Sequence, residues 1–173
     1  MRVVEGIYLL LGSNLGDRNQ NLRSAREHVG QKAGSVVRVS SIYETEAWGV
    51  LDQPLFYNQV LKIETQLEHE PLLHVLLSIE QKIGKVKVGK WRERLIDIDL
   101  LYYGNRLVRT STLTLPHPEI PNRRFTLAPL VELVPNELHP ELYQSHRKLL
   151  EITPDKLEVW KAKDRKTKTG DRS

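Results

Sequence analysis

The clearest alternation of apolar and polar positions lies at residues 95–101, which read LIDIDLL. Successive side chains of a β-strand point to opposite faces, so the isoleucines share one face while Asp97 and Asp99 share the other. At a rise of about 3.3 Å per residue, the two carboxylates start roughly 7 Å apart along the strand. Two carboxylates this close raise each other's pKa unless a nearby cation offsets their charge, and a divalent metal could be that cation. The alternative is a strand with a polar outer face on which Asp97 pairs with Arg94.

The same kind of pattern predicts three further strands and two helices. The strands are expected at residues 7–11, 36–44 and 56–65. The first helix starts at Asp17, a capping residue with Gln20 three positions on, and the region ends at Gly34. The second helix starts at Glu70-Pro71, carries an apolar stripe and stops at Gly84.

This order of elements (strand, helix, strand, strand, helix, strand) is the ferredoxin-like split βαβ arrangement. It predicts an α+β fold with an antiparallel sheet and two helices packed on one face. C-terminal additions are expected to include a helix that Asn122 caps and another near residues 147–152. We expect a single domain over residues 1–160 and a charged, disordered tail over residues 161–173.

Composition narrows the class of protein without identifying its function. The chain has 173 residues, 39% of them hydrophobic and 28% charged, which is typical of one globular domain. No apolar run reaches the ~18–20 residues of a membrane span. The absence of cysteine excludes disulfides, thiolate metal sites and cysteine nucleophiles, and it fits a cytoplasmic protein. A net charge of +4 suits either nucleic acid or nucleotide phosphates as a partner.

Two groups of residues suggest chemistry next to the acidic strand. Residues 85–94 form an expected loop with five cations and Trp91, running directly into that strand. Such a charge run is usually a solvated surface, but a metal-bridged phosphate would complement both the cations and the carboxylates. Phe56 and Asn58 share a strand face, where a ring and an amide suit a flat heterocycle; core packing is the alternative.

Two other motifs have a structural explanation beside a functional one. The sequence GSNLGD at residues 12–17 lacks the Lys-Ser/Thr ending of a Walker A loop and the spacing of a dinucleotide fold. We interpret it as a tight turn into a capped helix. His117 lies between two prolines and a few residues before Arg123 and Arg124. A lone histidine is more often structural, but these arginines could bind an anion beside it.

Five stretches, taken in order, carry a specific resemblance. They are GSNLGDR at 12–18, SSIYET at 40–45, DQPLFYN at 52–58, RLIDID at 94–99, and LPHP at 115–118 with NRRF at 122–125. In this set and order the chain resembles the 6-hydroxymethyl-7,8-dihydropterin pyrophosphokinase family of folate biosynthesis. The resemblance covers about residues 5–140.

The resemblance implies transfer of the β,γ-pyrophosphate of ATP, the co-substrate, to the hydroxymethyl oxygen of the pterin, with release of AMP. It implies two Mg²⁺ ions bound by Asp97 and Asp99, which would be catalytic together with Arg94 and Lys85. The pterin-binding residues that it implies are Thr45, Trp48, Phe56, Asn58 and Phe125. The ATP-binding residues that it implies are Glu80, Lys87, Trp91, Arg94, Leu100, Thr114, His117 and Arg123.

The chain departs from the family pattern near the ATP site. Arg92-Glu93 stands where members commonly have Gly-Pro, and Thr112 stands where many carry an ATP-contacting arginine. Lys85 and Lys87 replace arginines that are common there, and lysine offers a point charge in place of a planar fork. A nucleic-acid-binding module of the same fold and a non-catalytic pterin-binding relative are the alternatives. We expect a cytoplasmic monomer that binds neither nucleic acid nor membrane.

Overall fold

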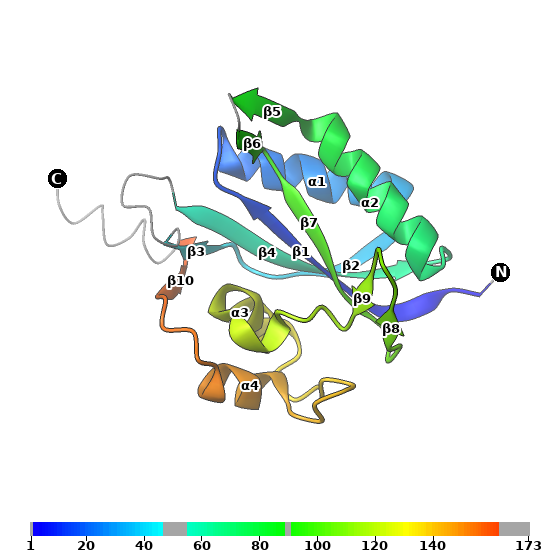
Figure 1. Cartoon of the computed structure of the whole chain (residues 1–173), viewed down its shortest axis with the longest axis vertical. Helices are drawn as coiled ribbons and strands as arrows, with labels where there is room; N and C mark the ends of the chain where they lie inside the picture. Colours follow the sequence, from blue (N-terminus) through cyan, green and yellow to red (C-terminus); the bar gives the residue numbers. More distant parts are fainter. Residues whose placement is uncertain (1, 47–54, 89–90, 163–173) are drawn as a thin grey trace, which may run out of the picture.

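The computed structural model describes residues 2–46, 55–88 and 91–162, and for 85–88 and 91–94 it describes the backbone alone. Within these residues the chain forms four α-helices, a short 3₁₀ helix and ten strands (Figure 1). In chain order they are β1 (Val4–Ser13), α1 (Arg18–Lys32), β2 (Ser35–Val39), β3 (Tyr43–Thr45), β4 (Phe56–Thr65), α2 (His69–Ile83), β5 (Lys85–Val88), β6 (Trp91–Arg94), β7 (Asp97–Tyr103), β8 (Val108–Arg109), β9 (Thr114–Leu115), η1 (Ile120–Asn122), α3 (Arg124–Leu133), α4 (His146–Ile152) and β10 (Val159–Lys161).

The main sheet has the strand order β10-β3-β4-β1-β7, with β2 also paired to β4, and each of its pairings is antiparallel. Helices α1 and α2 cover one face, and α3 and α4 lie on the other (Figure 1). One apolar cluster joins the sheet to α1 and α2, and a second joins it to α3 and α4. The α+β class and the antiparallel sheet predicted from the sequence are confirmed.

The strand expected at 36–44 is broken into β2 and β3, which pair with successive parts of β4. At the break, the Ser40 backbone N–H donates to the Val60 carbonyl at 2.9 Å, and the Val60 N–H donates to Ser40 Oγ at 2.9 Å. The pairing register of β3 with β4 therefore differs from that of β2 with β4, and Thr45 lies directly opposite Phe56.

Two other local predictions were wrong. The expected loop at 85–94 contains the paired strands β5 and β6, in which Lys85 lies opposite Arg94. Asn122 does not cap α3, because it belongs to the 3₁₀ helix before it. The first backbone N–H of α3, on Arg124, instead donates to Asp155 Oδ2 at 2.8 Å.

The turn after β1 leads into a capped helix and also positions the acidic strand. Asp17 caps α1 by accepting from the Gln20 N–H at 3.1 Å, as predicted. Ser13 Oγ donates to the Leu95 carbonyl at 2.6 Å, and Asn21 Nδ2 reaches the same oxygen at 3.2 Å. Two side chains therefore fix the backbone two residues before Asp97.

His146, at the start of α4, is buried with both ring nitrogens in hydrogen bonds. Its Nδ1 lies 2.9 Å from the Val134 carbonyl, which can only accept, so this nitrogen carries the proton. Its Nε2 lies 2.8 Å from the Tyr102 hydroxyl, from which it accepts when the ring is neutral. Burial lowers the pKa of His146 below its ordinary value of 6.5.

This geometry predicts that acid weakens the fold. Because the folded-state pKa of His146 is lowered, its contribution to the free energy of unfolding is present above about pH 6.5 and is lost as the pH falls through the lowered pKa. We expect His146→Gln to flatten the decline in unfolding free energy between pH 8 and pH 5, measured by urea titration. Part of the decline should remain, since burial also lowers the pKa of His139. His74→Gln, exposed on α2, is the control; equal slopes in the two variants would contradict the assignment.

No helix in the part of the chain that the structure describes is long and apolar enough to cross a membrane.

Candidate active site

A row of directly opposed residues crosses three central strands on the face that α3 covers. Gly12 of β1 lies opposite Asn58 of β4 on one side and opposite Asp97 of β7 on the other. Leu10, two residues earlier, lies opposite Asp99. Directly opposed residues of antiparallel strands share a face, and neighbouring strands are about 4.8 Å apart. An amide and two carboxylates thus share one surface, separated by about two strand spacings.

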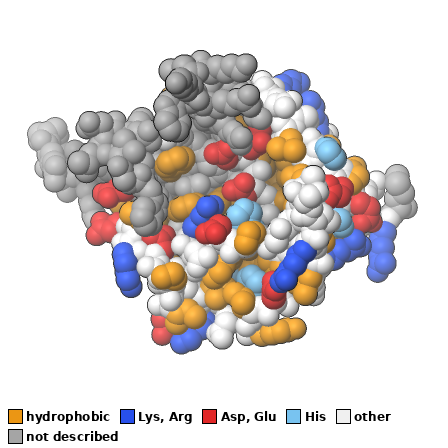
Figure 2. Space-filling view, in the orientation of Figure 1, with side chains coloured by type: hydrophobic (Ala, Val, Ile, Leu, Met, Phe, Trp, Pro, Cys, Tyr) orange, Lys and Arg blue, Asp and Glu red, His pale blue; other side chains and the backbone are white. Residues whose placement is uncertain are grey.

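A cavity of about 440 Å³ opens over this row. It brings together seven of the expected site residues: Thr45, Phe56, Asn58, Asp97, Asp99, Arg123 and Phe125. Figure 2 shows acidic, basic and histidine side chains gathered near the middle of the molecule in this view. Residues far apart in the sequence therefore converge on a single hollow, with aromatic groups and carboxylates in its wall.

One part of the cavity suits a flat, polar heterocycle. Phe56 on β4 and Phe125 on α3 are both half-buried and line the cavity. Asn58 is 4% exposed, and its Nδ2 donates to the Leu11 carbonyl at 3.3 Å. The buried Thr45 hydroxyl has no hydrogen-bond partner among the described residues. Two rings for stacking and two buried polar groups are the pattern of a small-molecule site.

Gly12 leaves room for the Asn58 amide. A Cβ atom built on Gly12 would lie 2.8 Å from Asn58 Nδ2, closer than real Cβ contacts allow. The strand position is otherwise ordinary, so glycine is required here by the close approach of the neighbouring side chain.

This contact predicts a substrate-specific defect in Gly12→Ala. The added methyl should push the Asn58 amide out of place and raise KM for the heterocyclic substrate about tenfold, equivalent to about 1.4 kcal/mol. Steady-state kinetics with each substrate varied in turn measure this, and KM for the nucleotide should change less than twofold. Gly30→Ala on α1, where a Cβ would meet only Val36 Cγ2 at 4.0 Å, is the matched control. Equal kinetics in both variants would contradict the role of Gly12.

The carboxylate part of the cavity is bounded by the segment after β9. The backbone N–H of His117 donates to the Leu101 carbonyl at 2.9 Å, which ties this segment to β7. His117 Nδ1 accepts from the Glu119 N–H at 3.2 Å, so Nε2 carries the proton of the neutral ring. Burial lowers the pKa of His117, and the nearby Asp99 charge opposes that effect. Arg123 Nε lies 3.8 Å from Glu119 Oε2.

Asp97 and Asp99 fit a magnesium site of a particular kind. The described residues contain no group of three or more His, Cys, Asp or Glu side chains arranged to hold a metal. Mg²⁺ is commonly bound by one or two carboxylates, with water and substrate phosphate oxygens completing the octahedron. Two half-buried carboxylates on one face of β7, both lining the cavity, match that donor set.

Four expected ATP-site residues, one of them His117, lie outside the cavity wall. The Leu100 side chain is 3% exposed and packs in the apolar cluster under α1 and α2. Glu80 is 3% exposed, and its Oε2 accepts from the Ile98 N–H at 2.8 Å, between the two aspartates. The exposed Thr114 lies on β9. Trp48 and the side chains of Lys85, Lys87, Trp91 and Arg94 lie outside the described part of the chain.

The cavity also contains residues that the sequence analysis missed. They are Leu10, Gly12, Glu46, Glu119 and Asn122. The two-residue period places Leu10 and Gly12 on one strand face, but only the pairing with β4 and β7 shows which face is functional. Glu119 and Asn122 are near neighbours of Arg123 in sequence, and the 3₁₀ helix turns them toward the same hollow.

Comparison with known proteins gives one consistent answer. A family model described as 7,8-dihydro-6-hydroxymethylpterin-pyrophosphokinase matches residues 8–135. A 2-amino-4-hydroxy-6-hydroxymethyldihydropteridine pyrophosphokinase of Aquifex aeolicus is 40% identical over 134 residues, which cover 78% of this chain and 83% of that protein. The folic acid synthesis protein fol1 of Pneumocystis carinii is 39% identical over 136 residues, 79% of this chain but only 18% of that longer protein.

A solved structure agrees at the level of the fold. The Plasmodium falciparum HPPK-DHPS triple mutant with STZ-DHP superimposes with a TM-score of 0.70 at 15% identity, over 87% of this chain and 43% of that chain. The present chain thus spans less than half of that larger protein. The family model covers most of the sequence, including the strands that carry the aspartates and the amide. The chain belongs to the 7,8-dihydro-6-hydroxymethylpterin-pyrophosphokinase family.

Proposed function

We infer that this chain transfers the pyrophosphoryl group of ATP to 6-hydroxymethyl-7,8-dihydropterin, giving the pterin diphosphate and AMP in folate biosynthesis. The observation that supports this best is the single cavity in which Asn58 and Asp97 lie on either side of Gly12. A heterocycle held at the amide would direct a substituent across β1 toward the carboxylates. This is the arrangement that a transfer between a pterin and a metal-bound nucleotide requires.

The pterin ring binds between Phe56 and Phe125, with its polar edge facing Asn58 and Thr45. Stacking on two rings supplies much of the affinity, and the amide offers both a donor and an acceptor to the edge. By resemblance, main-chain groups near Trp48, which lies outside the described residues, would complete the pocket. Buried polar groups at the edge would reject rings that lack the matching donors and acceptors.

The triphosphate lies at the carboxylate part of the cavity. Asp97 and Asp99 would hold two Mg²⁺ ions, whose charge would neutralise that of the phosphates. Arg94, Lys85, Lys87 and Arg123 bind phosphate oxygens, and the arginines can do so with two parallel hydrogen bonds. Glu80, Trp91, Leu100, Thr114 and His117 lie around the rest of the nucleotide. Glu80 orients the acidic strand through the Ile98 N–H, and Leu100 contributes its backbone, since its side chain is in the core.

The remaining expectations concern the molecule as a whole. The order β7-β1-β4, with β2 and β3 beyond β4 and two helices on one face, supports a ferredoxin-like core. We expect a cytoplasmic monomer with one domain over residues 1–160 and a charged, disordered tail over residues 161–173. Neither nucleic acid nor membrane is an expected partner.

The experiment that tests the function identifies the nucleotide product. The protein is mixed with ATP, Mg²⁺ and 6-hydroxymethyl-7,8-dihydropterin, and products are separated by ion-pair chromatography and assigned by ³¹P NMR. AMP in a one-to-one ratio with a pterin diphosphate is expected, and AMP should not appear when the pterin is left out. Formation of ADP, or no reaction, would contradict the assignment.

A further inference from the structure

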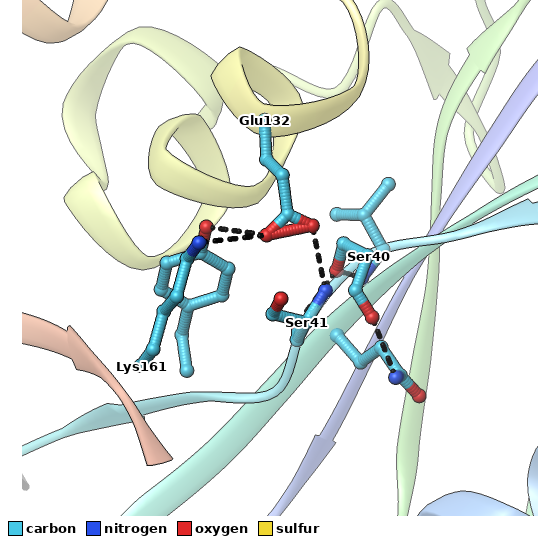
Figure 3. Close-up of polar contacts among 7 residues, drawn as sticks. Ser40, Ser41, Glu132 and Lys161 are labelled. Atoms are coloured by element: carbon cyan, nitrogen blue, oxygen red, sulfur yellow. Dashed lines mark hydrogen bonds and ion pairs between the residues drawn. The ribbon is translucent and has the colours of Figure 1, made fainter. Parts of the chain in front are cut away.

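The carboxylate of Glu132, on α3, contacts residues at the start of β3 and on β10 (Figure 3). Its Oε2 accepts from the Ser41 backbone N–H at 2.7 Å, and its Oε1 accepts from the Tyr43 hydroxyl at 2.9 Å. Lys161 Nζ, on β10, lies 3.8 Å from Oε1. Partial burial raises the pKa of Glu132, but the hydrogen bonds and the Lys161 charge outweigh it and lower the pKa below 4.5. The carboxylate is therefore ionised at neutral pH.

Glu132 joins β3 to α3, and each of these two elements forms one wall of the cavity. On β3, Tyr43 and Thr45 are two residues apart and point to the same face. On α3, Phe125 and Glu132 are seven residues apart, about two turns, and lie on the same side of the helix. The carboxylate thus ties the strand that carries Thr45 to the helix that carries Phe125. Glu132 itself does not line the cavity.

The C-terminal segment supports the same two walls, although it lies outside the residues 8–135 that the family model matches. Strand β10 pairs with β3, placing Val159 opposite Thr45. Trp160 Nε1 donates to Glu44 Oε2 at 2.8 Å. At the other wall, Asp155 accepts from the first N–H of α3, one residue before Phe125. The spacing between β3 and α3 is therefore fixed by polar contacts at several points.

Apolar packing holds α3 on the sheet without the help of Glu132. Leu127, Leu130 and Leu133 of α3 belong to the cluster that also contains Leu10 and Val60 of the sheet. β3, by contrast, has only three residues and depends on its neighbours for its position. Loss of the carboxylate should leave the layers packed and remove the direct polar tie between β3 and α3, while the indirect tie through the C-terminal segment remains.

We propose that Glu132 is a positioning residue for the pterin, which sets the spacing between Thr45 and Phe125 without touching the substrate. This rests on the proposed function, because it assumes that these two residues grip the heterocycle. Thr45 has a buried hydroxyl with no partner among the described residues, so a small shift of β3 changes whether a ligand can reach it. The nucleotide part of the cavity, on β7, is separated from β3 by the two strands β4 and β1 and should be unaffected.

The test compares pterin and nucleotide affinity in Glu132→Ala and Glu132→Gln by isothermal titration calorimetry. The probes are 6-hydroxymethyl-7,8-dihydropterin, titrated in the presence of Mg²⁺ and a non-hydrolysable ATP analogue, and that analogue with Mg²⁺ alone. Glu132→Ala should weaken pterin binding at least tenfold and change analogue binding less than twofold. Glu132→Gln should stay within about threefold of wild type, because its amide can still accept from Ser41 and donate to the Tyr43 oxygen.

Two further variants keep the test decisive. Tyr43→Phe removes one of the hydrogen bonds and retains the ring, so it should weaken pterin binding in the same direction even if Glu132→Ala unfolds. Glu151→Ala is the matched control, since it removes an exposed ion pair with Lys148 on α4. Wild-type pterin affinity in Tyr43→Phe and Glu132→Ala, equal loss of both ligands, or a Gln variant as impaired as Ala would each overturn the proposal. A wild type that binds no pterin would overturn the proposed function as well, and that result is visible before any variant is compared.

Discussion

Replacing Asp97 or Asp99 with asparagine is expected to lower kcat about 10³-fold, which is about 4 kcal/mol of activation barrier. Both carboxylates lie on the cavity face of β7, where they can share the charge of a bound divalent metal. Asparagine keeps the shape of the side chain and loses its charge, so the fold should survive while metal affinity falls. Steady-state AMP formation at saturating substrates gives kcat, and circular dichroism verifies the fold.

The control for this prediction is Asp17→Asn, which removes the same charge at the cap of α1. Asparagine is as good a capping residue as aspartate, so kcat should remain within twofold of wild type. A near-normal kcat in either Asp97→Asn or Asp99→Asn would refute the metal-binding role of that residue. Raising the Mg²⁺ concentration should restore part of the lost rate if the defect is in metal affinity.

The second large effect is expected for Asn58→Ala, in which KM for the pterin should rise about 100-fold. The amide is buried in the cavity wall. Its removal would leave polar groups of the bound pterin without hydrogen-bond partners and away from water. Each such group costs about 1–3 kcal/mol, and two of them account for about 3 kcal/mol in total. KM for ATP should change less than threefold, because the amide lies across β1 from the carboxylates.

Gln59→Met provides the contrast for Asn58→Ala. Gln59 is the next residue along β4 and points to the opposite face, where its amide donates to the Ser40 carbonyl and accepts from Arg26. Its replacement should lower the melting temperature and leave KM for the pterin unchanged. If both variants raised KM for the pterin equally, the defect would be one of folding, and Asn58 would not be a substrate-binding residue.

The sequence was sufficient to predict the acidic strand and its orientation. Ile96 and Ile98 are buried in the cluster under α1 and α2, so the aspartates between and beyond them face α3. The alternation of apolar and polar residues predicts this orientation, because burial of one strand face is a local property of the sequence. The register that places Gly12 between Asn58 and Asp97 joins three strands distant in the chain, and no local pattern specifies it.

The two errors have different origins, one local and one non-local. The charge of residues 85–94 favoured a loop, but the alternation of KVKV was the better guide to β5. Asn122 has the chemistry of a helix cap, yet the acceptor that α3 uses comes from Asp155, 31 residues away from Arg124. Thr112, which departs from the family pattern, has a hydrogen-bond partner in the fold: its hydroxyl donates to Glu70 Oε1 on α2 at 3.0 Å. The side chains of Arg92 and Glu93 lie outside the described part of the chain.

A crystal structure with Mn²⁺, a non-hydrolysable ATP analogue and 6-hydroxymethyl-7,8-dihydropterin tests the central claim most directly. Mn²⁺ occupies magnesium sites and is located by its anomalous scattering. We expect anomalous peaks about 2.1 Å from carboxylate oxygens of Asp97 and Asp99, with the pterin ring between Phe56 and Phe125. Manganese bound at other residues, or a pterin outside this cavity, would contradict it.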